Sequence, residues 1–272
     1  MKEKCVDILS ELTGKKHVLL VQRGNVAIRL ALKLAKSLGY NQVLLQDQGG
    51  WITYRQFCKK EKLEYSDIKT DYGIVELSTI KNYSGCALLI NSMPAYAALQ
   101  GMREIARVCM KQNNFIINDA SGSIGKEEAK YGDIILGSFA IDKPVNISSH
   151  GGFIATNNKE YFDFLEKNNP PFEIDFICLL GKLNNLNKRL SDLKAIKNKL
   201  IQQLEATEFA NKIIHSDKKD HSNGINLIVK FDSEKQKEKL IKLAEKENLE
   251  FTLCPRDIRV NERAVSFEIK RR

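Results

Sequence analysis

One stretch decides the fold: the run His17-Val-Leu-Leu-Val21, the turn Gln22-Arg-Gly-Asn25, and residues 26–37. The run is short and apolar, which is typical of a buried strand. In residues 26–37, apolar side chains and alanines recur at helical spacing, and Gly39 ends the pattern. A strand that turns sharply into an amphipathic helix is the unit from which parallel α/β sheets are built. The stretch therefore predicts an α/β fold.

The same alternation continues through the first two-thirds of the chain. Further helices are predicted at 4–12, 53–61 and 99–112, and further strands at 42–45, 64–68, 86–90, 115–118, 133–139 and 152–155. Strands that alternate with helices favour a parallel sheet with helices on both faces. The predicted fold is a mainly parallel sheet of the seven-stranded type, sandwiched by helices.

The pattern changes after residue 165. Pro170-Pro171 interrupts it, and residues 176–205 then carry leucines and isoleucines along one face, as in one long helix. A small α+β unit follows, with strands at 226–231, 250–253 and 264–270 and a helix at 233–248. We expect a large domain over 1–165, a connecting helix within 166–210 and a small α+β domain over 211–272.

Composition and charge exclude several classes of protein. Hydrophobic residues make up 43% of the 272, which is enough to bury a core and excludes a disordered chain. The net charge of +9 is spread along the chain and interleaved with acids, which favours a solvated lysine-rich surface over a polyanion site. A nucleic-acid partner remains a minor alternative, and the tail Lys270-Arg271-Arg272 is the most exposed candidate for it.

Membrane and metal sites are not expected either. Apolar runs such as 86–90 are far shorter than the roughly 20 residues that span a bilayer, and no charged-then-apolar leader opens the chain. The six cysteines form no Cys-x-x-Cys pair and do not cluster with the four histidines, so no zinc site is predicted. This use of cysteine favours a reducing compartment, the cytoplasm.

The residues that follow the strands are the first place to look for a site, because open parallel sheets bind ligands at the carboxyl ends of their strands. Gly24 and Asn25 open the helix over 26–37, where free backbone N–H groups favour an anion; an ordinary turn with Asn25 as N-cap is the alternative. Trp51 follows Gly49-Gly50 and is suited to stacking on a planar ligand, or else to plugging the core.

Two further strand ends carry chemistry. Asp119, followed by small residues, is suited to holding a protonated ring nitrogen, although a turn-forming aspartate is the alternative. Lys143 lies just past a strand and before the bend Ser148-Ser-His-Gly-Gly152; it is a candidate Schiff-base nucleophile, or else a surface lysine. These four features together match the needs of pyridoxal phosphate. The cofactor requires a site for its phosphate, a surface that stacks on its ring, a carboxylate for its ring nitrogen and an amine that forms an imine.

With these residues in view, the chain resembles fold-type I pyridoxal-phosphate enzymes, and most of all the DegT/DnrJ/StrS aminotransferases. Residues 12–32 resemble that family's opening strand and its Ser-Gly-Thr-x-Ala-Leu helix, residues 105–121 its Ile-x-Asp-Ala-Ala segment, and residues 133–156 its Phe-Ser-Phe-x-Pro-x-Lys and Gly-Gly segment. The resemblance implies an aminotransferase that acts on a small amino or keto substrate. It also implies a homodimer with sites at the subunit interface.

Individual roles follow from the same resemblance. It implies that Lys143 forms the Schiff base, that Asp119 pairs with the pyridine nitrogen, that Trp51 stacks on the ring, and that the phosphate is held by Gly24, Asn25 and Ser138. The sequence departs from the family at Arg23-Gly24-Asn25, which replaces Ser-Gly-Thr. It also departs at Gly122, where a Gln or His usually touches the cofactor hydroxyl, and at His150, which replaces a Glu. The chain is about a hundred residues shorter than usual members, mostly at its C-terminal end.

Two other functions stay open on the sequence. A lyase, desulfurase or selenium-transfer type of enzyme would use the same cofactor on an amino acid, with Arg256, Arg259 or Arg263 binding its carboxylate; a basic solvated loop is the alternative interpretation of these arginines. His150 is a further candidate for substrate contact. A degenerate homologue kept for binding or regulation would explain the departures at Gly122 and His150.

Overall fold

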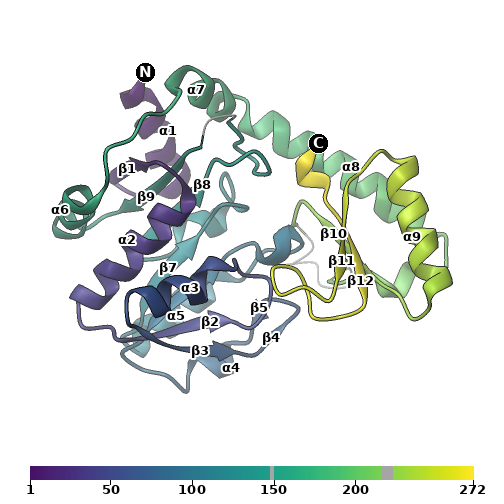
Figure 1. Ribbon diagram of the computed structural model, residues 1–272, viewed down its shortest axis with the longest axis horizontal. Helices are drawn as coiled ribbons and strands as arrows, with labels where there is room; N and C mark the ends of the chain where they lie inside the picture. The colour runs from purple at the N-terminus through teal and green to yellow at the C-terminus, as the bar shows by residue number, and fades with distance from the viewer. Residues whose placement is uncertain (148–149, 216–222) are drawn as a thin grey trace.

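The computed structural model describes residues 1–147, 150–215 and 223–272; Ser148 and Ser149 of the glycine-rich bend lie outside the described residues (Figure 1). One large sheet has the order β1-β9-β8-β7-β6-β2-β3. Its strands are β1 (His17–Val21), β2 (Gln42–Gln46), β3 (Glu64–Ile68), β6 (Ala87–Asn91), β7 (Phe115–Asp119), β8 (Ile134–Ser138) and β9 (Gly152–Thr156). Strand β9 runs antiparallel to β1 and β8, and the remaining pairs are parallel. The predicted mainly parallel seven-stranded sheet is confirmed.

Both faces of this sheet are covered, which is why its strands are apolar throughout: all five residues of β6 are buried. One face packs against α2 (Gly24–Ser37), α3 (Thr53–Lys60) and α6 (Lys159–Asn168). The other face packs against α1 (Lys2–Thr13), α4 (Leu77–Ile80) and α5 (Met102–Lys111). Neighbouring side chains of β6 point to opposite faces: Leu89 packs on the face covered by α2 and α3, and Leu88 on the face covered by α4 and α5.

The segment expected to be one helix over 176–205 is two helices, α7 (Phe176–Asn184) and α8 (Leu186–Glu205). The break is at Asn185, whose side-chain Nδ2 donates to the carbonyl of Gly181 at 2.8 Å. Asparagine competes in this way with the backbone for hydrogen bonds and so favours helix ends. The sequence analysis also missed α6 and the short hairpin of β4 (Thr70–Asp71) and β5 (Ile74–Val75).

The C-terminal unit is a three-stranded antiparallel sheet in the order β10-β12-β11, covered by α9 (Glu234–Lys246). Its strands are β10 (Leu227–Lys230), β11 (Phe251–Cys254) and β12 (Ala264–Phe267). The last strand was predicted to reach residue 270, but it ends at Phe267, and the short 3-10 turn Ile269–Arg271 follows. This turn carries Lys270 into a buried position.

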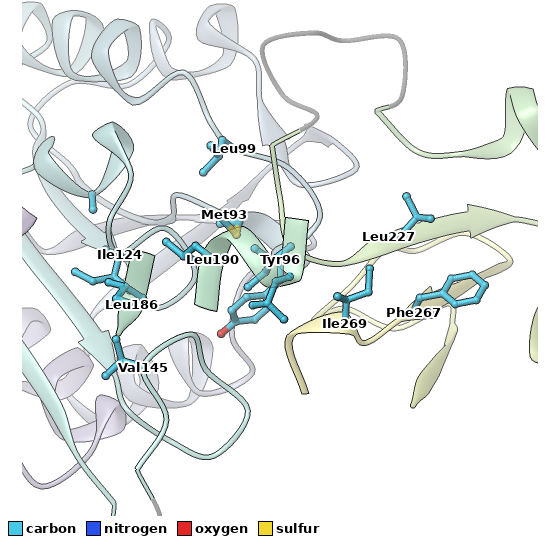
Figure 2. Close-up of a cluster of buried hydrophobic side chains, with 14 of the residues drawn as sticks. Met93, Tyr96, Leu99, Ile124, Val145, Leu186, Leu190, Leu227, Phe267 and Ile269 are labelled. Carbon is cyan, nitrogen blue, oxygen red and sulfur yellow. The ribbon is translucent and has the colours of Figure 1, made fainter. Parts of the chain in front are cut away.

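One apolar cluster joins the two sheets. Figure 2 shows Met93 and Tyr96, from the loop after β6, beside Leu190 of α8, with Phe267 and Ile269 of the C-terminal unit following on the other side. The C-terminal unit therefore shares a core with the region at the strand ends of the large sheet. Among the described residues, no helix is long and apolar enough to cross a membrane.

Candidate active site

A cavity of about 290 Å³ lies at the carboxyl ends of β1, β2, β6, β7 and β8, the edge at which an α/β sheet presents its loops. The predicted site residues that line it are Gly24, Asn25, Trp51, Asp119, Ser138, Lys143 and His150. Residues far apart along the chain, such as Gly24 and His150, thus meet in one hollow. The C-terminal unit closes it with Ile258, Arg259, Lys270 and Arg271.

The start of α2 and the end of β8 form a close-packed cradle. A Cβ atom on Gly24 would lie 2.7 Å from the Cβ of Ser138, so no larger residue fits there. The Ser138 hydroxyl accepts from the backbone N–H of Ala140 at 3.3 Å. Because the first N–H groups of a helix lack carbonyl partners within it, this end of α2 favours an anion.

Asn25 does not cap this helix, so the alternative interpretation as an N-cap is wrong. The N-cap position is Arg23, which makes no side-chain cap hydrogen bond. The Oδ1 atom of Asn25 instead accepts from the indole N–H of Trp51 at 3.1 Å and from the hydroxyl of Thr53 at 3.2 Å. Asn25 therefore fixes the tryptophan at the edge of the cradle.

Trp51 forms part of the cavity wall with an exposed ring and does not plug the core. The Nζ atom of Lys143 lies 5.1 Å from the centre of that ring. A flat aromatic surface and an amine therefore face the same space. The motifs predicted a stacking surface and an amine for one site; both line this cavity, and their roles stay predictions.

Asp119 is a buried carboxylate with both oxygens anchored. Its Oδ2 accepts from the hydroxyl of Tyr54 at 2.6 Å, and its Oδ1 accepts from the backbone N–H of Ser121 at 3.0 Å. Burial, and then the neighbouring Asp119 charge, raise the pKa of Tyr54 well above its usual value, so Tyr54 keeps its proton and donates. Each carboxylate oxygen can accept a second hydrogen bond, so Asp119 retains capacity toward the cavity.

Lys143 donates to the hydroxyl of Tyr96, and its Nζ atom lies 4.7 Å from the centre of that ring. Tyr96 follows β6 in a tight turn where both Ala95 (φ 52°) and Tyr96 (φ 62°) are left-handed. Such residues persist only where the surroundings hold them. Here the Tyr96 carbonyl accepts from the backbone N–H groups of Ile225 at 2.8 Å and Asn226 at 2.7 Å. The C-terminal unit thus holds the residue that contacts Lys143.

Tyr96 also accounts for the departure at Gly122. A Cβ atom on Gly122 would lie 2.9 Å from Tyr96 Cδ1 and 3.1 Å from Met93 Cβ. The tyrosine ring therefore occupies the space into which a Gln or His side chain at 122 would extend. Glycine at this position is a packing requirement of this chain.

The arginines proposed for substrate contact differ in position. Arg259 lies in the cavity wall, but its guanidinium holds Glu268 through Nε at 2.8 Å and Nη2 at 2.7 Å. Arg256 is exposed and lies outside the cavity wall. The expectation of an exposed basic tail was wrong at Lys270, which is 2% exposed because its turn packs beneath Tyr96 and beside Glu268.

The sequence analysis missed Tyr54, Tyr96 and Lys270. Tyr96 could have been found by the rule that ligands bind at the ends of strands, because it follows strand β6 just as Asp119 ends β7. Tyr54 lies three positions after Trp51, on the first turn of α3. Lys270 carried no comparable signal, since only the tertiary fold brings the last residues of the chain to the cavity.

No family model matches the sequence, and no curated protein matches it. Solved structures do match. A DegT DnrJ EryC1 StrS aminotransferase from Brucella abortus is 15% identical, with a TM-score of 0.75 over 98% of this chain and 84% of that one. The chain shares its fold with that aminotransferase.

Two further structures have the same fold. The ntda protein from Bacillus subtilis, with bound cofactor PMP, is 16% identical with a TM-score of 0.74 over 98% of this chain and 72% of that one. Helicobacter pylori PseC, an aminotransferase involved in the biosynthesis of pseudoaminic acid, is 12% identical. Its TM-score is 0.74 over 97% of this chain and 84% of that one. The resemblance seen in the three sequence segments therefore extends, at the level of the fold, over nearly the whole chain.

Proposed function

We propose that this protein is a pyridoxal-phosphate-dependent aminotransferase with Lys143 as the residue that attaches the cofactor. One observation carries the proposal: Lys143, Asp119, Trp51 and the cradle at Gly24 line one cavity at the strand ends. The fold, shared with aminotransferases over 97–98% of the chain, supports it.

The residues present fit this cofactor. The cradle between Gly24 and Ser138 is too tight for any side chain and ends in helix N–H groups, which suits a phosphate. The buried Asp119 has a fixed orientation, which suits a protonated ring nitrogen. Trp51 offers the flat surface and Lys143 the amine. The four groups have different chemistry, and each suits a different part of one molecule.

The chain's own residues would divide the work as follows. When bound, pyridoxal phosphate supplies an electron sink for the substrate amine's α-carbon. Asp119 holds a proton at the ring nitrogen, and Tyr54 and Ser121 keep that carboxylate in place. The Nζ atom of Lys143 would take the α-proton from the substrate carbon and deliver it to the cofactor carbon bonded to the substrate's nitrogen, because it is the amine beside the aromatic surface. Tyr96 positions Lys143 through its hydroxyl.

The test is covalent labelling. The purified protein is incubated with pyridoxal phosphate, its near-ultraviolet and visible spectrum is recorded, and it is reduced with borohydride. Peptide mapping by mass spectrometry should find the reduced adduct on Lys143. The Lys143→Ala variant should lose both the spectrum and the adduct, whereas Lys111→Ala, at an exposed position of α5, should keep them. A wild-type protein that never acquires the adduct would end the proposal.

Amine donors then separate the reaction types. An aminotransferase converts its cofactor to the pyridoxamine form when it is given a donor without an acceptor. A lyase or desulfurase returns to its starting spectrum and releases a new product, and a degenerate homologue shows no change with any donor. Only the first result supports the proposed reaction.

We also propose a homodimer in the cytoplasm. Ile141 lines the cavity and is 71% exposed, and an exposed apolar side chain there suits a subunit interface. Ile52, next to Trp51 in the sequence, is a second exposed apolar residue, at 57%. The six free cysteines agree with a reducing compartment. Light scattering coupled to gel filtration should give twice the chain mass, and Ile141→Glu should shift it to the monomer. A monomeric wild type would contradict the dimer and leave the labelling result standing.

A further inference from the structure

Trp51 is the only tryptophan of the chain, and little packing holds its ring in place. It follows Gly49 and Gly50, and it is 37% exposed. Its ring borders the main cavity and also a second, smaller hollow of about 20 Å³. Within the described residues, its side chain makes one hydrogen bond, from the indole N–H to Oδ1 of Asn25 at 3.1 Å. This bond, more than packing, sets the position of the ring.

The amide of Asn25 can have only one orientation here. An indole N–H donates and never accepts, and the hydroxyl of Thr53 donates to the same atom of Asn25 at 3.2 Å. The atom that faces Trp51 and Thr53 is therefore the oxygen, and Nδ2, on the other side of the same carbon, points away from them. In the described part of the chain, no group accepts from Nδ2. Asn25 lines the cavity, so its amide joins Trp51 to a donor on the cavity side.

This donor lies next to the cradle at the start of α2. The backbone N–H groups of Val26 and Ala27 both donate to the carbonyl of Arg23, at 2.9 and 3.3 Å. The N–H groups of Gly24 and Asn25 come earlier in the helix and have no carbonyl partner among the described residues. A phosphate group has three strong acceptor oxygens. Two backbone N–H groups and the side-chain Nδ2 of Asn25 are donors suited to them.

We propose that Asn25 couples the phosphate cradle to Trp51, so that a phosphate in the cradle fixes the indole where it stacks on the cofactor ring. The inference rests on the proposed function and concerns how its site selects the phosphorylated cofactor. The last torsion of an asparagine side chain has a broad energy well, so the amide alone holds Trp51 loosely. A phosphate that accepts from Nδ2 restrains this torsion and polarises the amide, which makes Oδ1 a stronger acceptor for the indole.

The coupling acts in both directions. Because linkage between two binding events is reciprocal, a ring that stacks on Trp51 also strengthens phosphate binding in the cradle. The site should therefore favour pyridoxal phosphate over pyridoxal by more than the phosphate contacts alone provide. Asn25 is thus a positioning residue for Trp51 as well as a ligand for the phosphate.

The single tryptophan allows the coupling to be observed without any reaction. The purified chain, before pyridoxal phosphate is added, is titrated with inorganic phosphate while the fluorescence anisotropy of Trp51 and its quenching by acrylamide are recorded. Phosphate should raise the anisotropy and slow the quenching, because the indole is held more firmly. Potassium chloride at the same ionic strength should change neither.

Asn25→Asp is the matched variant for this titration. The carboxylate still accepts from Trp51 and Thr53, but it has no N–H for the phosphate, so the fluorescence response should disappear. Asn41→Asp adds the same charge at an exposed position just before β2 and should keep the response.

A second experiment measures the coupling itself. Pyridoxal, which lacks the phosphate, is titrated with and without saturating inorganic phosphate, and the absorbance of its imine gives an apparent Kd. Phosphate should tighten pyridoxal binding to the wild type about 5- to 50-fold, the range of ordinary coupling between two sites. Trp51→Phe keeps an aromatic ring but lacks the indole N–H that contacts Asn25. In this variant the tightening should fall below about twofold.

The outcomes separate this inference from the proposed function. A wild type that forms the adduct with pyridoxal phosphate, but whose Trp51 does not respond to inorganic phosphate, would overturn the coupling and leave the function intact. A full response in Asn25→Asp, or full tightening in Trp51→Phe, would overturn it as well. A wild type that takes up no pyridoxal phosphate would remove the proposed function, and the fluorescence titration would then decide by itself whether an anion in the cradle controls Trp51.

Discussion

The cavity has two walls that differ in how they are built. The strand-end wall, with Gly24, Asp119, Ser138 and Lys143, is made of residues that each end or follow a strand of the large sheet. The C-terminal wall contains Arg259 and Lys270, which form one buried charge group with Glu268 behind them, packed against Tyr96. In the first wall the backbone sets the positions, whereas in the second wall side chains hold one another. Removing a single charge should therefore lower the free energy of unfolding much more in the C-terminal wall than in the strand-end wall.

The largest effect is expected from Glu268→Gln. The substitution keeps the size of the side chain but leaves Arg259 and Lys270 without a counter-charge, and breaking a buried ion pair costs about 3–5 kcal/mol. Burial raises the pKa of Glu268, but hydrogen bonds and charge from Arg259 outweigh it and lower the pKa to about 2, so the wild type keeps this charge throughout the neutral range. Urea unfolding measures the loss.

Glu250→Gln is the matched control. Glu250 pairs with Arg271 at the surface of the same unit, where its side chain is 66% exposed, and a surface pair contributes at most about 1 kcal/mol. If Glu268→Gln were no more destabilising than Glu250→Gln, the buried charge group would not hold this wall, and the contrast between the two walls would fail.

The two walls also differ in how far sequence predicts them. Each residue of the strand-end wall could be found from the position of its strand, because the side-chain period and the strand-end rule act locally. The C-terminal wall depends on the ion pair between Glu268 and Arg259, nine positions apart, and on a turn that buries Lys270. The sequence alone indicated only an exposed basic tail. The one-helix prediction failed for a related reason, since a single side-chain hydrogen bond at Asn185 ends α7.

Asp119→Asn tests the strand-end wall. The amide keeps the shape of the side chain but loses the charge that would hold a proton on the ring nitrogen. We expect turnover of the amine donor to fall about 100-fold, comparable to the loss of one preorganised electrostatic contact. The free energy of unfolding should change by less than about 1 kcal/mol, in contrast to Glu268→Gln. Stopped-flow absorbance with the loaded protein measures the rate, and Asp163→Asn, on the exposed side of α6, is the control. Unchanged turnover would remove Asp119 from the site.

Lys197 connects the two walls and gives a prediction about pH. Its Nζ atom, buried on α8, donates to the carbonyls of Ala97 at 3.3 Å and Gly224 at 3.0 Å. Burial lowers its pKa to about 8, below the 10.5 of an exposed lysine. Between pH 8 and 10.5 this lysine is neutral in the folded chain but still protonated in the unfolded chain. The unfolded chain therefore binds more protons, and the free energy of unfolding rises with pH across this range.

The measurement is the free energy of unfolding of the wild type minus that of Lys197→Met, across this pH range. The difference should rise with pH by about 2–3 kcal/mol. The variant Lys194→Met, at an exposed position of the same helix, should give a profile parallel to the wild type. A flat difference for Lys197→Met would mean that this lysine reaches water and does not connect the walls.

The smallest effect is expected at Gly122, which lies against Tyr96, the residue on which the C-terminal wall packs. In Gly122→Ala the new Cβ would lie 2.9 Å from Tyr96 Cδ1, and Tyr96 cannot withdraw freely because the backbone of Ile225 and Asn226 holds it. Overpacking of this kind costs about 1–3 kcal/mol. In the double variant with Tyr96→Leu the ring is absent, so Gly122→Ala should cost about 1 kcal/mol less than it does in the wild type. Equal costs in both backgrounds would mean that Gly122 is not fitted to Tyr96. The glycine would then remain an unexplained departure, and the position of Tyr96 between the two walls would not depend on it.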